Sequence, residues 1–344
     1  MKIISLITND SKCGANFVHY TLARKHTKWS IISLRKSKEG FYDEDITSLN
    51  LTRLSMLNIR KIIKKLKVMF GSADVIIGDG VFSYLYLYII KKTCPKLKVY
   101  ALVHNDYTQN SRTNWGFVPD FIFTFIYDII LSKHDVITTS RSAYEAISQR
   151  CNSVDFIDNG VDKPISRSGF SSSDTEVNYW FIGRFVKVKQ LDLLVLAFKR
   201  LPKNCVLNLV GDGPLKSKIL SLCIESGINF KDWGYSDKPF ENVSKGDVFV
   251  LPSLIEGRSI ALMEAILCGC SCVVSNIPAN NEFVPYGAIP FDVNSDKDLT
   301  DKLLMLSSMS EIERFSLIDY SKASKCLSTD NMLEKYLRIF NEIK

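Results

Sequence analysis

The chain alternates short, β-rich apolar runs with amphipathic helical patterns, and it does so in two separate blocks. In the first block five runs end in small or polar residues, with helical patterns between them: KIISLI (2–7), WSIISL (29–34), DVIIGD (74–79), KVYALVH (98–104) and DVITTS (135–140). Parallel strands need a crossover connection, and a helix usually supplies it. The alternation therefore predicts a doubly wound α/β domain built on a parallel sheet.

The segment 163–178, KPISRSGFSSSDTEVN, interrupts this pattern. It is rich in serine, contains proline and glycine, and has no apolar period, so it predicts a loop or linker at a domain boundary. The alternation then restarts at VNYWFIGR and continues to CSCVVSN. We therefore predict two Rossmann-like domains, 1–165 and 178–320, facing a cleft, and a C-terminal helix, 321–344, that can cross back to the first domain. In such sheets the ligand lies at the carboxyl ends of the strands.

Composition indicates a globular protein of the cytoplasm. The 344 residues are 46% hydrophobic and 24% charged, enough for a core without disulfides. The nine cysteines show no paired metal spacing, and Cys268, Cys270 and Cys272 fit small buried hydrophobes at a helix end and a strand. No targeting segment is visible, and the longest apolar run, 117–131, is short and carries two aspartates. We predict a cytoplasmic protein, with peripheral attachment to the inner membrane face as an option.

The basic charge is concentrated in the first half of the chain. Residues 1–165 carry 23 Lys and Arg against 15 Asp and Glu, whereas residues 166–344 carry 21 against 22. The helical pattern 58–70 has one apolar face, and around the other face lie five cations: Arg60, Lys61, Lys64, Lys65 and Lys67. This pattern fits a helix on an anionic membrane and, equally, a helix packed on a sheet with a solvated outer face. A nucleic-acid partner is not predicted, because no recognition motif accompanies the charge.

Two common nucleotide-binding signatures are absent. The nearest match to a dinucleotide fingerprint is LVGDGPLK, where Lys216 occupies the position of the third glycine, and it lies in the middle of the chain. No Walker A sequence occurs. The sequence therefore contains no motif that indicates hydride transfer or P-loop chemistry.

The stretch EGRSIALME (256–264) places two glutamates eight positions apart. It follows a predicted buried strand, and a helix is expected to begin near Ser259, a good N-cap residue. Gly257 lets the backbone approach a ligand, and the free N–H groups of the helix start favour an anion. Glu256 would then lie in the loop and Glu264 about a turn and a half into the helix. The spacing predicts carboxylates at two parts of one ligand, with a phosphate between them.

This stretch resembles the E-x7-E motif of the retaining, nucleotide-sugar-dependent glycosyltransferases of the GT-B fold, family four. Four further segments are similar to motifs of that family in the same order along the chain: FIDNGVD (156–162), FIGRFVKVKQ (181–190), LVGDGP (209–214) and CGCSCVVSNIPANNEFV (268–284). Each match alone is weak, whereas their order and spacing together are specific. The resemblance covers nearly the whole chain and implies the GT-B architecture.

The resemblance implies roles for the residues that match the family motifs. Arg184 and Lys189 match the pair that grips the donor diphosphate, where charge builds as the glycosidic bond breaks. Glu264 matches the carboxylate that accepts from the ribose hydroxyls. Glu256 matches the glutamate beside the donor sugar, where it either stabilises positive charge at the anomeric carbon or holds a hydroxyl. Structural roles as caps or salt-bridge partners are the alternatives.

Other positions match the family less closely. His104 follows a strand and matches a residue that contacts the donor sugar from the first domain. Gly14 matches a glycine that lets the backbone approach the donor, although its usual partner glycine is replaced by Cys13. Gln190 stands where the family has a glycine. Arg258 stands where an apolar residue is usual, and it can add a cation at the phosphates or face the acceptor.

The sequence therefore predicts a retaining glycosyltransferase that transfers a sugar from a nucleoside-diphosphate sugar to an acceptor. By analogy the acceptor is a lipid-linked glycan or a lipopolysaccharide or capsule precursor. We expect no metal and no cofactor besides the donor. The alternatives are a nucleotide-sugar epimerase of the same fold, which needs no acceptor, and a non-catalytic nucleotide-sugar-binding subunit.

Overall fold

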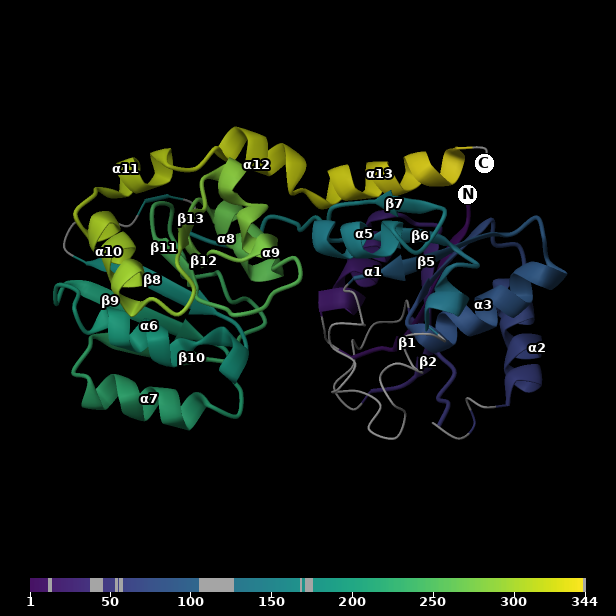
Figure 1. The fold of residues 1–344 in the computed structure, drawn as a ribbon, viewed down its shortest axis with the longest axis horizontal. Helices are drawn as coiled ribbons and strands as arrows, with labels where there is room; N and C mark the ends of the chain where they lie inside the picture. The colour runs from purple at the N-terminus through teal and green to yellow at the C-terminus, as the bar shows by residue number, and fades with distance from the viewer. Residues whose placement is uncertain are drawn as a thin grey trace. The chain divides into compact units, whose positions relative to one another are not determined.

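The structure is a computed structural model with two compact units (Figure 1). It describes residues 1–11, 14–37, 46–52, 55, 58–104, 127–167, 169–170 and 176–342. Unit 1 comprises Met1–Gly160 and Thr329–Lys344, and unit 2 comprises Val161–Ser328. Each unit has its own sheet and its own hydrophobic core, so each is described by itself.

Unit 1 is built on a seven-stranded sheet in the order β3-β2-β1-β4-β5-β6-β7, and every described pairing is parallel. The strands are β1 (Ile3–Asn9), β2 (Trp29–Arg35), β3 (Ile46–Ser48), β4 (Val75–Asp79), β5 (Lys98–Val103), β6 (Asp135–Thr138) and β7 (Val154–Phe156). The chain order reverses between β1 and β4, so the topological switch point of this sheet lies between these two strands.

Helices cover both faces of the unit 1 sheet because its strands bury both of their faces. In β1, Ile3 and Ile7 pack with α1 and the C-terminal helix, whereas Ile4 and Leu6 pack with α2 and α3. The helices are α1 (Gly14–Lys25), α2 (Ile59–Phe70), α3 (Val81–Thr93), α5 (Arg141–Ser148) and α13 (Thr329–Asn341). The expectation of a doubly wound α/β architecture is therefore confirmed for this unit.

For the apolar face of helix α2, the structure decides between the two predicted environments, an anionic membrane or the sheet. Ile62, Leu66 and Phe70 are buried in the core beside β1 and β4, so the apolar face packs on the sheet. The five cations predicted on the other face are all exposed, and none forms an ion pair in the described part of the chain. Any membrane contact of this helix must therefore use its charged face rather than its apolar one.

Unit 2 is built on a six-stranded parallel sheet in the order β10-β9-β8-β11-β12-β13. The strands are β8 (Val177–Ile182), β9 (Cys205–Val210), β10 (Phe230–Gly234), β11 (Val248–Leu251), β12 (Ser271–Ser275) and β13 (Ile289–Phe291). Here the chain order reverses between β8 and β11, which places the switch point at the carboxyl ends of these two strands. Two parallel α/β units of this kind are the GT-B architecture, as the sequence predicted.

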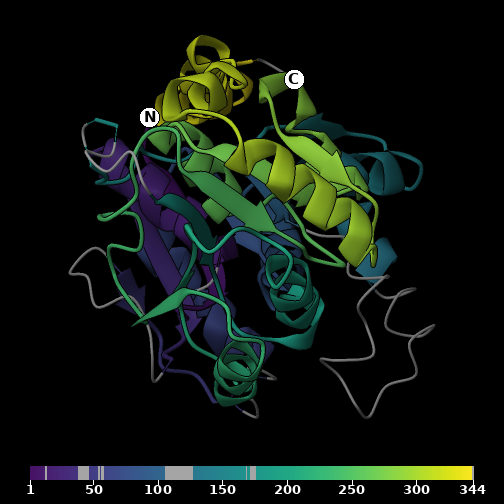
Figure 2. The same ribbon diagram turned by 90° about the vertical axis from the view of Figure 1, so that its left-hand side faces the viewer.

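The helices of unit 2 also lie on both faces of their sheet (Figure 2). One face packs on α6, α7 and α10 through buried residues such as Tyr179 and Leu207. On the other side α8 packs on β11 and β12, and α12 packs on α8. The helices are α6 (Leu191–Phe198), α7 (Lys216–Glu225), α8 (Ile260–Cys268), α9 (Pro278–Asn281), α10 (Asp296–Ser307), α11 (Glu311–Ser316) and α12 (Tyr320–Cys326), with 3₁₀ turns η4 (Lys187–Lys189) and η5 (Val284–Tyr286).

The unit boundaries differ from the predicted domain limits for identifiable reasons. The described part of the serine-rich segment packs on unit 2, because Arg167 N donates to Val243 O and Lys245 N donates to Gly169 O. The last residues form two helices rather than one. Helix α13 belongs to unit 1, where Tyr336 and Phe340 pack on Trp29.

None of the helices in the described ranges combines the length and the apolar character that a membrane crossing requires. The predicted apolar run 117–131 lies outside the described residues except for its last five, of which Tyr127 and Leu131 are buried.

Candidate active site

The switch point of unit 2 brings together the two loops that carry most of the predicted site residues. Strands β8 and β11 are parallel neighbours, with Val248 opposite Tyr179 and Phe249 opposite Trp180. The loop after β8 carries Arg184 and leads into η4, and the loop after β11 carries Glu256 and leads into α8. Since ligands of open α/β sheets bind at this position, the topology supports the predicted location of the site.

Arg184 projects from a loop that a neighbouring glycine turn supports. Phe185 N donates to Asp212 O at 2.8 Å, and Gly183 N donates to Val210 O at 3.0 Å. Gly211 has a φ of +132°, and a Cβ there would lie 2.0 Å from Gly183 O. The GDGP turn therefore needs its glycine so that two backbones can meet. Arg184 itself is exposed and has no ion-pair partner among the described residues.

Lys189 and Glu256 meet between the two loops. The Lys189 Nζ donates to Glu256 Oε1, and both side chains are largely buried. The loops are also joined through the backbone, where Leu254 N donates to Val188 O at 2.8 Å. A cation and a carboxylate predicted to serve one donor are thus adjacent in the structure.

The start of α8 has the predicted capped geometry. Ser259 is the N-cap residue, and its Oγ accepts from Leu262 N at 3.3 Å. Gly257 lies in the preceding loop, two residues before the cap. The first turn of a helix has N–H groups without intrahelical partners, and the helix dipole adds positive potential there. This helix start can therefore hold an anionic group close to Lys189.

Glu264 lies in the second turn of α8 and is partly buried. Burial raises the pKa of Glu264 to about 7, because the ionised form is poorly solvated there. No hydrogen bond or ion pair of its carboxyl group exists within the described residues. A buried carboxyl group whose ionisation is unfavourable, and which forms no hydrogen bond or ion pair within the described residues, is a candidate for ligand binding.

Arg258 pairs with Glu282, a residue to which the sequence analysis assigned no role. Its Nη1 donates to Glu282 Oε2 at 2.6 Å, and its guanidinium lies 5.0 Å from the centre of the Phe283 ring. The side chain is 4% exposed. The structure thus gives Arg258 partners in the chain, and its predicted contact with the donor phosphates or the acceptor stays a prediction. Glu282 lies in the segment 268–284 that resembles a family motif, and this resemblance was the available signal for its involvement.

Gln190 adopts a left-handed backbone conformation, which suits the glycine that the family has at this position. Its φ of +45° and ψ of +44° lie in the left-handed region, which glycine adopts most easily. The side chain is tied down, because Nε2 donates to Asn294 Oδ1 at 2.5 Å. The chain therefore keeps the backbone path of a glycine at this position.

The unit 1 candidates lie at the carboxyl ends of the strands of their own sheet, beside its switch point. His104 follows β5 directly, and its Nε2 lies 3.6 Å from Oδ2 of Asp79 at the end of β4. His19 of α1 approaches the same oxygen at 3.6 Å. These three buried residues are the group in the described chain whose ligand atoms lie close enough for a metal, all within 4.8 Å of one another. Gly14 is the first residue of α1, on the loop side of the same sheet.

His19 and Asp79 were not among the predicted site residues. The available signal was the position of Asp79, at the end of the run DVIIGD in the strand that neighbours the His104 strand. Cys268, Cys270 and Cys272 behave as predicted for small hydrophobes. All are buried, and burial raises the pKa of the Cys268 thiol to about 12.

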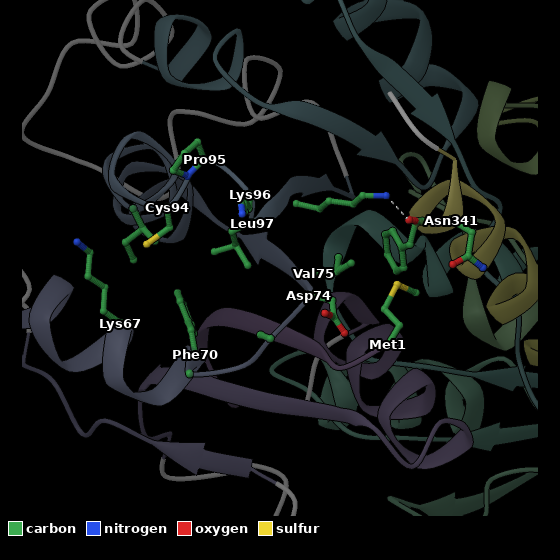
Figure 3. Close-up of a pocket in the computed structure, with 15 residues that line it drawn as sticks. Met1, Lys67, Phe70, Asp74, Val75, Cys94, Pro95, Lys96, Leu97 and Asn341 are labelled. Carbon is green, nitrogen blue, oxygen red and sulfur yellow. Dashed lines mark hydrogen bonds between the residues drawn. The ribbon is translucent and has the colours of Figure 1, made fainter.

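A cavity of about 730 Å³ in unit 1 lies away from these candidates (Figure 3). Its lining includes Val75 and Lys98, the first residues of β4 and β5, so it opens at the amino ends of the strands. Lys67 of α2 and Phe340 of α13 also line it. His104 and Asp79 lie at the opposite, carboxyl ends, so this cavity does not contain the predicted site.

Comparison with known proteins finds a family match inside unit 2. Residues 162–323 match the family model described as "Glycosyl transferases group 1". The matched segment lies within unit 2. It contains every predicted donor-binding residue except Gly14.

Similarity to individual proteins extends over the whole chain. The chain is 22% identical to the O-antigen biosynthesis glycosyltransferase WclY of Escherichia coli, over 100% of this chain and 99% of WclY. The solved structure of HepE from Anabaena in complex with UDP superposes with a TM-score of 0.82 at 14% identity, covering 100% of both chains. A 97-residue segment is 32% identical to a Campylobacter jejuni diphospho-undecaprenol N-acetylgalactosaminyltransferase, over 28% of this chain and 27% of that protein. The prediction of a glycosyltransferase enzyme with GT-B architecture is confirmed.

Proposed function

We propose that this glycosyltransferase takes its sugar from a nucleoside-diphosphate donor bound at the switch point of unit 2, and transfers it with retention. The observation that carries the proposal is the contact of Lys189, in the loop that also carries Arg184, with Glu256, in the loop that leads into the capped start of α8. Two cations and a helix N-terminus are suited to a diphosphate, whose leaving charge grows as the glycosidic bond breaks.

The donor would rearrange the Lys189–Glu256 pair. Lys189 would move its ammonium to the diphosphate, and the Glu256 carboxylate would be left beside the sugar. There it can stabilise positive charge at the anomeric carbon or accept from a hydroxyl. Glu264, one and a half turns further along the helix, would accept from the ribose hydroxyls. The donor supplies its own leaving group, so no metal or other cofactor enters this scheme.

The acceptor that we propose is a lipid-linked glycan of surface-polysaccharide assembly. WclY is named for O-antigen biosynthesis, and the Campylobacter relative acts on a diphospho-undecaprenol substrate. The charged face of α2 supports the same setting, because five exposed cations can hold unit 1 at an anionic membrane surface without inserting into it. We therefore propose peripheral attachment at the cytoplasmic face.

Acceptor-dependent release of nucleoside diphosphate tests the function. UDP-sugars are the first donors to test, because the Anabaena structure contains UDP. Membrane-extracted lipid-linked glycans serve as acceptors, and mass spectrometry of the glycolipid product identifies the transfer. Release of UDP that requires the acceptor supports a transferase. Interconversion of the UDP-sugar without acceptor would identify an epimerase instead.

A further inference from the structure

The carboxyl end of β4 holds a buried carboxylate that the donor site in unit 2 does not explain. Asp79 is 7% exposed, and its Oδ2 lies 3.6 Å from Nε2 of His19 and 3.6 Å from Nε2 of His104. Both distances are too long for a hydrogen bond. Neither Nε2 atom has a hydrogen-bond partner, although both side chains are buried. Two ring nitrogens therefore face one carboxylate oxygen, one from helix α1 and one from the residue after β5.

The hydrogen bonds on the far side of His19 favour one direction. Trp29 Nε1 is a donor only, and it donates to Ser5 Oγ at 2.9 Å. Ser5 Oγ lies 2.8 Å from Nδ1 of His19, so the hydroxyl that accepts from Trp29 can give its own proton to this nitrogen. In a neutral imidazole the proton is then on Nε2, which faces Asp79.

His104 likewise has one ring nitrogen beside a hydroxyl group and the other facing Asp79. Its Nδ1 lies 3.2 Å from Oγ1 of Thr139, and its Nε2 faces Asp79. A lone pair pointing at a buried carboxylate is repelled, whereas an N–H dipole is attracted. Burial lowers the pKa of His104 to about 4, so the ring is neutral near pH 7. Although burial opposes ionisation of Asp79, the neighbouring His19 and His104 hold the pKa of its carboxyl below the ordinary value.

We propose that Asp79 is a positioning residue for His104, fixing its imidazole as the tautomer with the proton on Nε2, and that His19 braces the carboxylate from the other side. His104 then has no free basic nitrogen, because Nδ1 faces the Thr139 hydroxyl. It contributes to transfer by its position rather than by accepting a proton. This inference rests on the proposed function and on the sequence resemblance that assigns His104 to the donor sugar.

The same three residues resemble a metal site, and the tautomer separates the two interpretations. A metal would need the lone pair of both Nε2 atoms and would put the ring protons on Nδ1. The positioning role needs the protons on Nε2. The Trp29–Ser5–His19 order favours the positioning role, since the Ser5 hydroxyl already accepts from Trp29 and has its proton available for Nδ1.

Nitrogen-15 NMR of the full chain labelled at histidine tests the proposal directly. The chain has only four histidines, and single His→Gln variants assign their signals. We expect wild-type His104 to be neutral and protonated on Nε2, and His19 to carry a proton on the Nε2 that faces Asp79. Asp79→Asn should populate the Nδ1-protonated form of His104 and lower kcat by about 10-fold to 100-fold, with the donor KM changed less than about 3-fold. Asp74→Asn, at the other end of β4, is the matched control and should change neither.

Three results would overturn the proposal. These are a wild-type His104 protonated on Nδ1, an unchanged tautomer or kcat in Asp79→Asn, and stoichiometric zinc in the purified enzyme with metal-shifted Nε2 signals. The NMR measurement does not depend on glycosyl transfer. If the tautomers are as expected but no transfer occurs with any donor, the proposed function fails and the positioning of His104 stands.

Discussion

Lys189 and Glu256 form an ion pair although they are 67 positions apart and belong to different loops. The adjacency of β8 and β11 in the sheet brings the loops together, and the Leu254–Val188 backbone bond holds them. Under the proposed function a diphosphate would compete with Glu256 for the Lys189 ammonium, and donor binding would thereby be coupled to release of the Glu256 carboxylate.

Lys189→Ala and Arg184→Ala are each expected to lower turnover by about 10²-fold to 10³-fold, because each removes a cation from the developing diphosphate charge. Steady-state kinetics with a UDP-sugar and the acceptor measure this. Lys187→Ala is the matched control, since Lys187 is an exposed lysine on the same 3₁₀ turn. Near-normal rates for either site variant, with circular dichroism like that of wild type, would remove the diphosphate assignment.

Glu264→Ala is expected to weaken nucleoside-diphosphate binding, whereas Glu256→Ala should mainly slow the chemical step. The ribose contact exists in the ground state, but the carboxylate beside the sugar matters most as charge develops. Calorimetry with UDP and single-turnover kinetics separate the two effects. Equal losses of UDP affinity in both variants would contradict this division.

Glu264→Gln is expected to stabilise the protein at pH 8 but not at pH 4.5. Burial raises the pKa of Glu264 from an ordinary 4.5 to about 7, so the folded state keeps a proton that the unfolded chain loses between these values. Stability contributed by the protonated group is complete below about pH 4.5 and is lost as the pH rises through 7. The gain at pH 8 should be about 1–3 kcal/mol, reduced by the partial exposure of the group.

Urea denaturation at both pH values measures that gain. Glu225→Gln, an exposed change on α7, should leave the difference between the two pH values as in wild type. A Glu264→Gln variant that is no more stable than wild type at pH 8 would show that this carboxyl ionises without cost in the folded protein.

The charged face of α2 is expected to hold the protein on anionic liposomes in low salt. Each exposed Lys or Arg contributes on the order of 1 kcal/mol, and salt should release the protein because it screens these charges. Changing Lys61, Lys64 and Lys65 to Gln should abolish co-sedimentation. The same triple change in unit 2, at Lys203, Lys218 and Lys238, keeps the net charge matched and should leave binding intact.

Two outcomes would count against the membrane contact. If both triple variants pellet like wild type, unit 1 does not bind through α2. If wild type itself stays in solution at low salt, the cations only solvate a packed helix and the acceptor must reach the enzyme another way.

Sequence reasoning could predict the sheet edges that carry the site, because each strand and the loop motif that follows it are short patterns, local in the chain. The loops after β8 and β11 and the Ser259 cap were all predicted from short patterns. The Lys189–Glu256 and Arg258–Glu282 pairs could not be, because rotamers and loop packing decide which charge meets which. The helix 58–70 shows the same limit: its pattern fitted two environments, and only the burial of Ile62, Leu66 and Phe70 decided its apolar face.

Asp79 was missed for a related reason. A single aspartate at a strand end has no sequence motif, and its meaning depends on His19 and His104, which lie 60 and 25 positions away in the chain. Parallel pairing of β1, β4 and β5 is what brings these residues to one point.

A crystal structure of the enzyme with UDP tests the central claim most directly. The account predicts the diphosphate at the start of α8, within hydrogen-bond distance of Arg184 and Lys189, with Lys189 released from Glu256 and a ribose hydroxyl on Glu264. A diphosphate bound elsewhere, such as the cavity at the amino ends of β4 and β5, or a Lys189 still paired with Glu256 beside bound UDP, would contradict it.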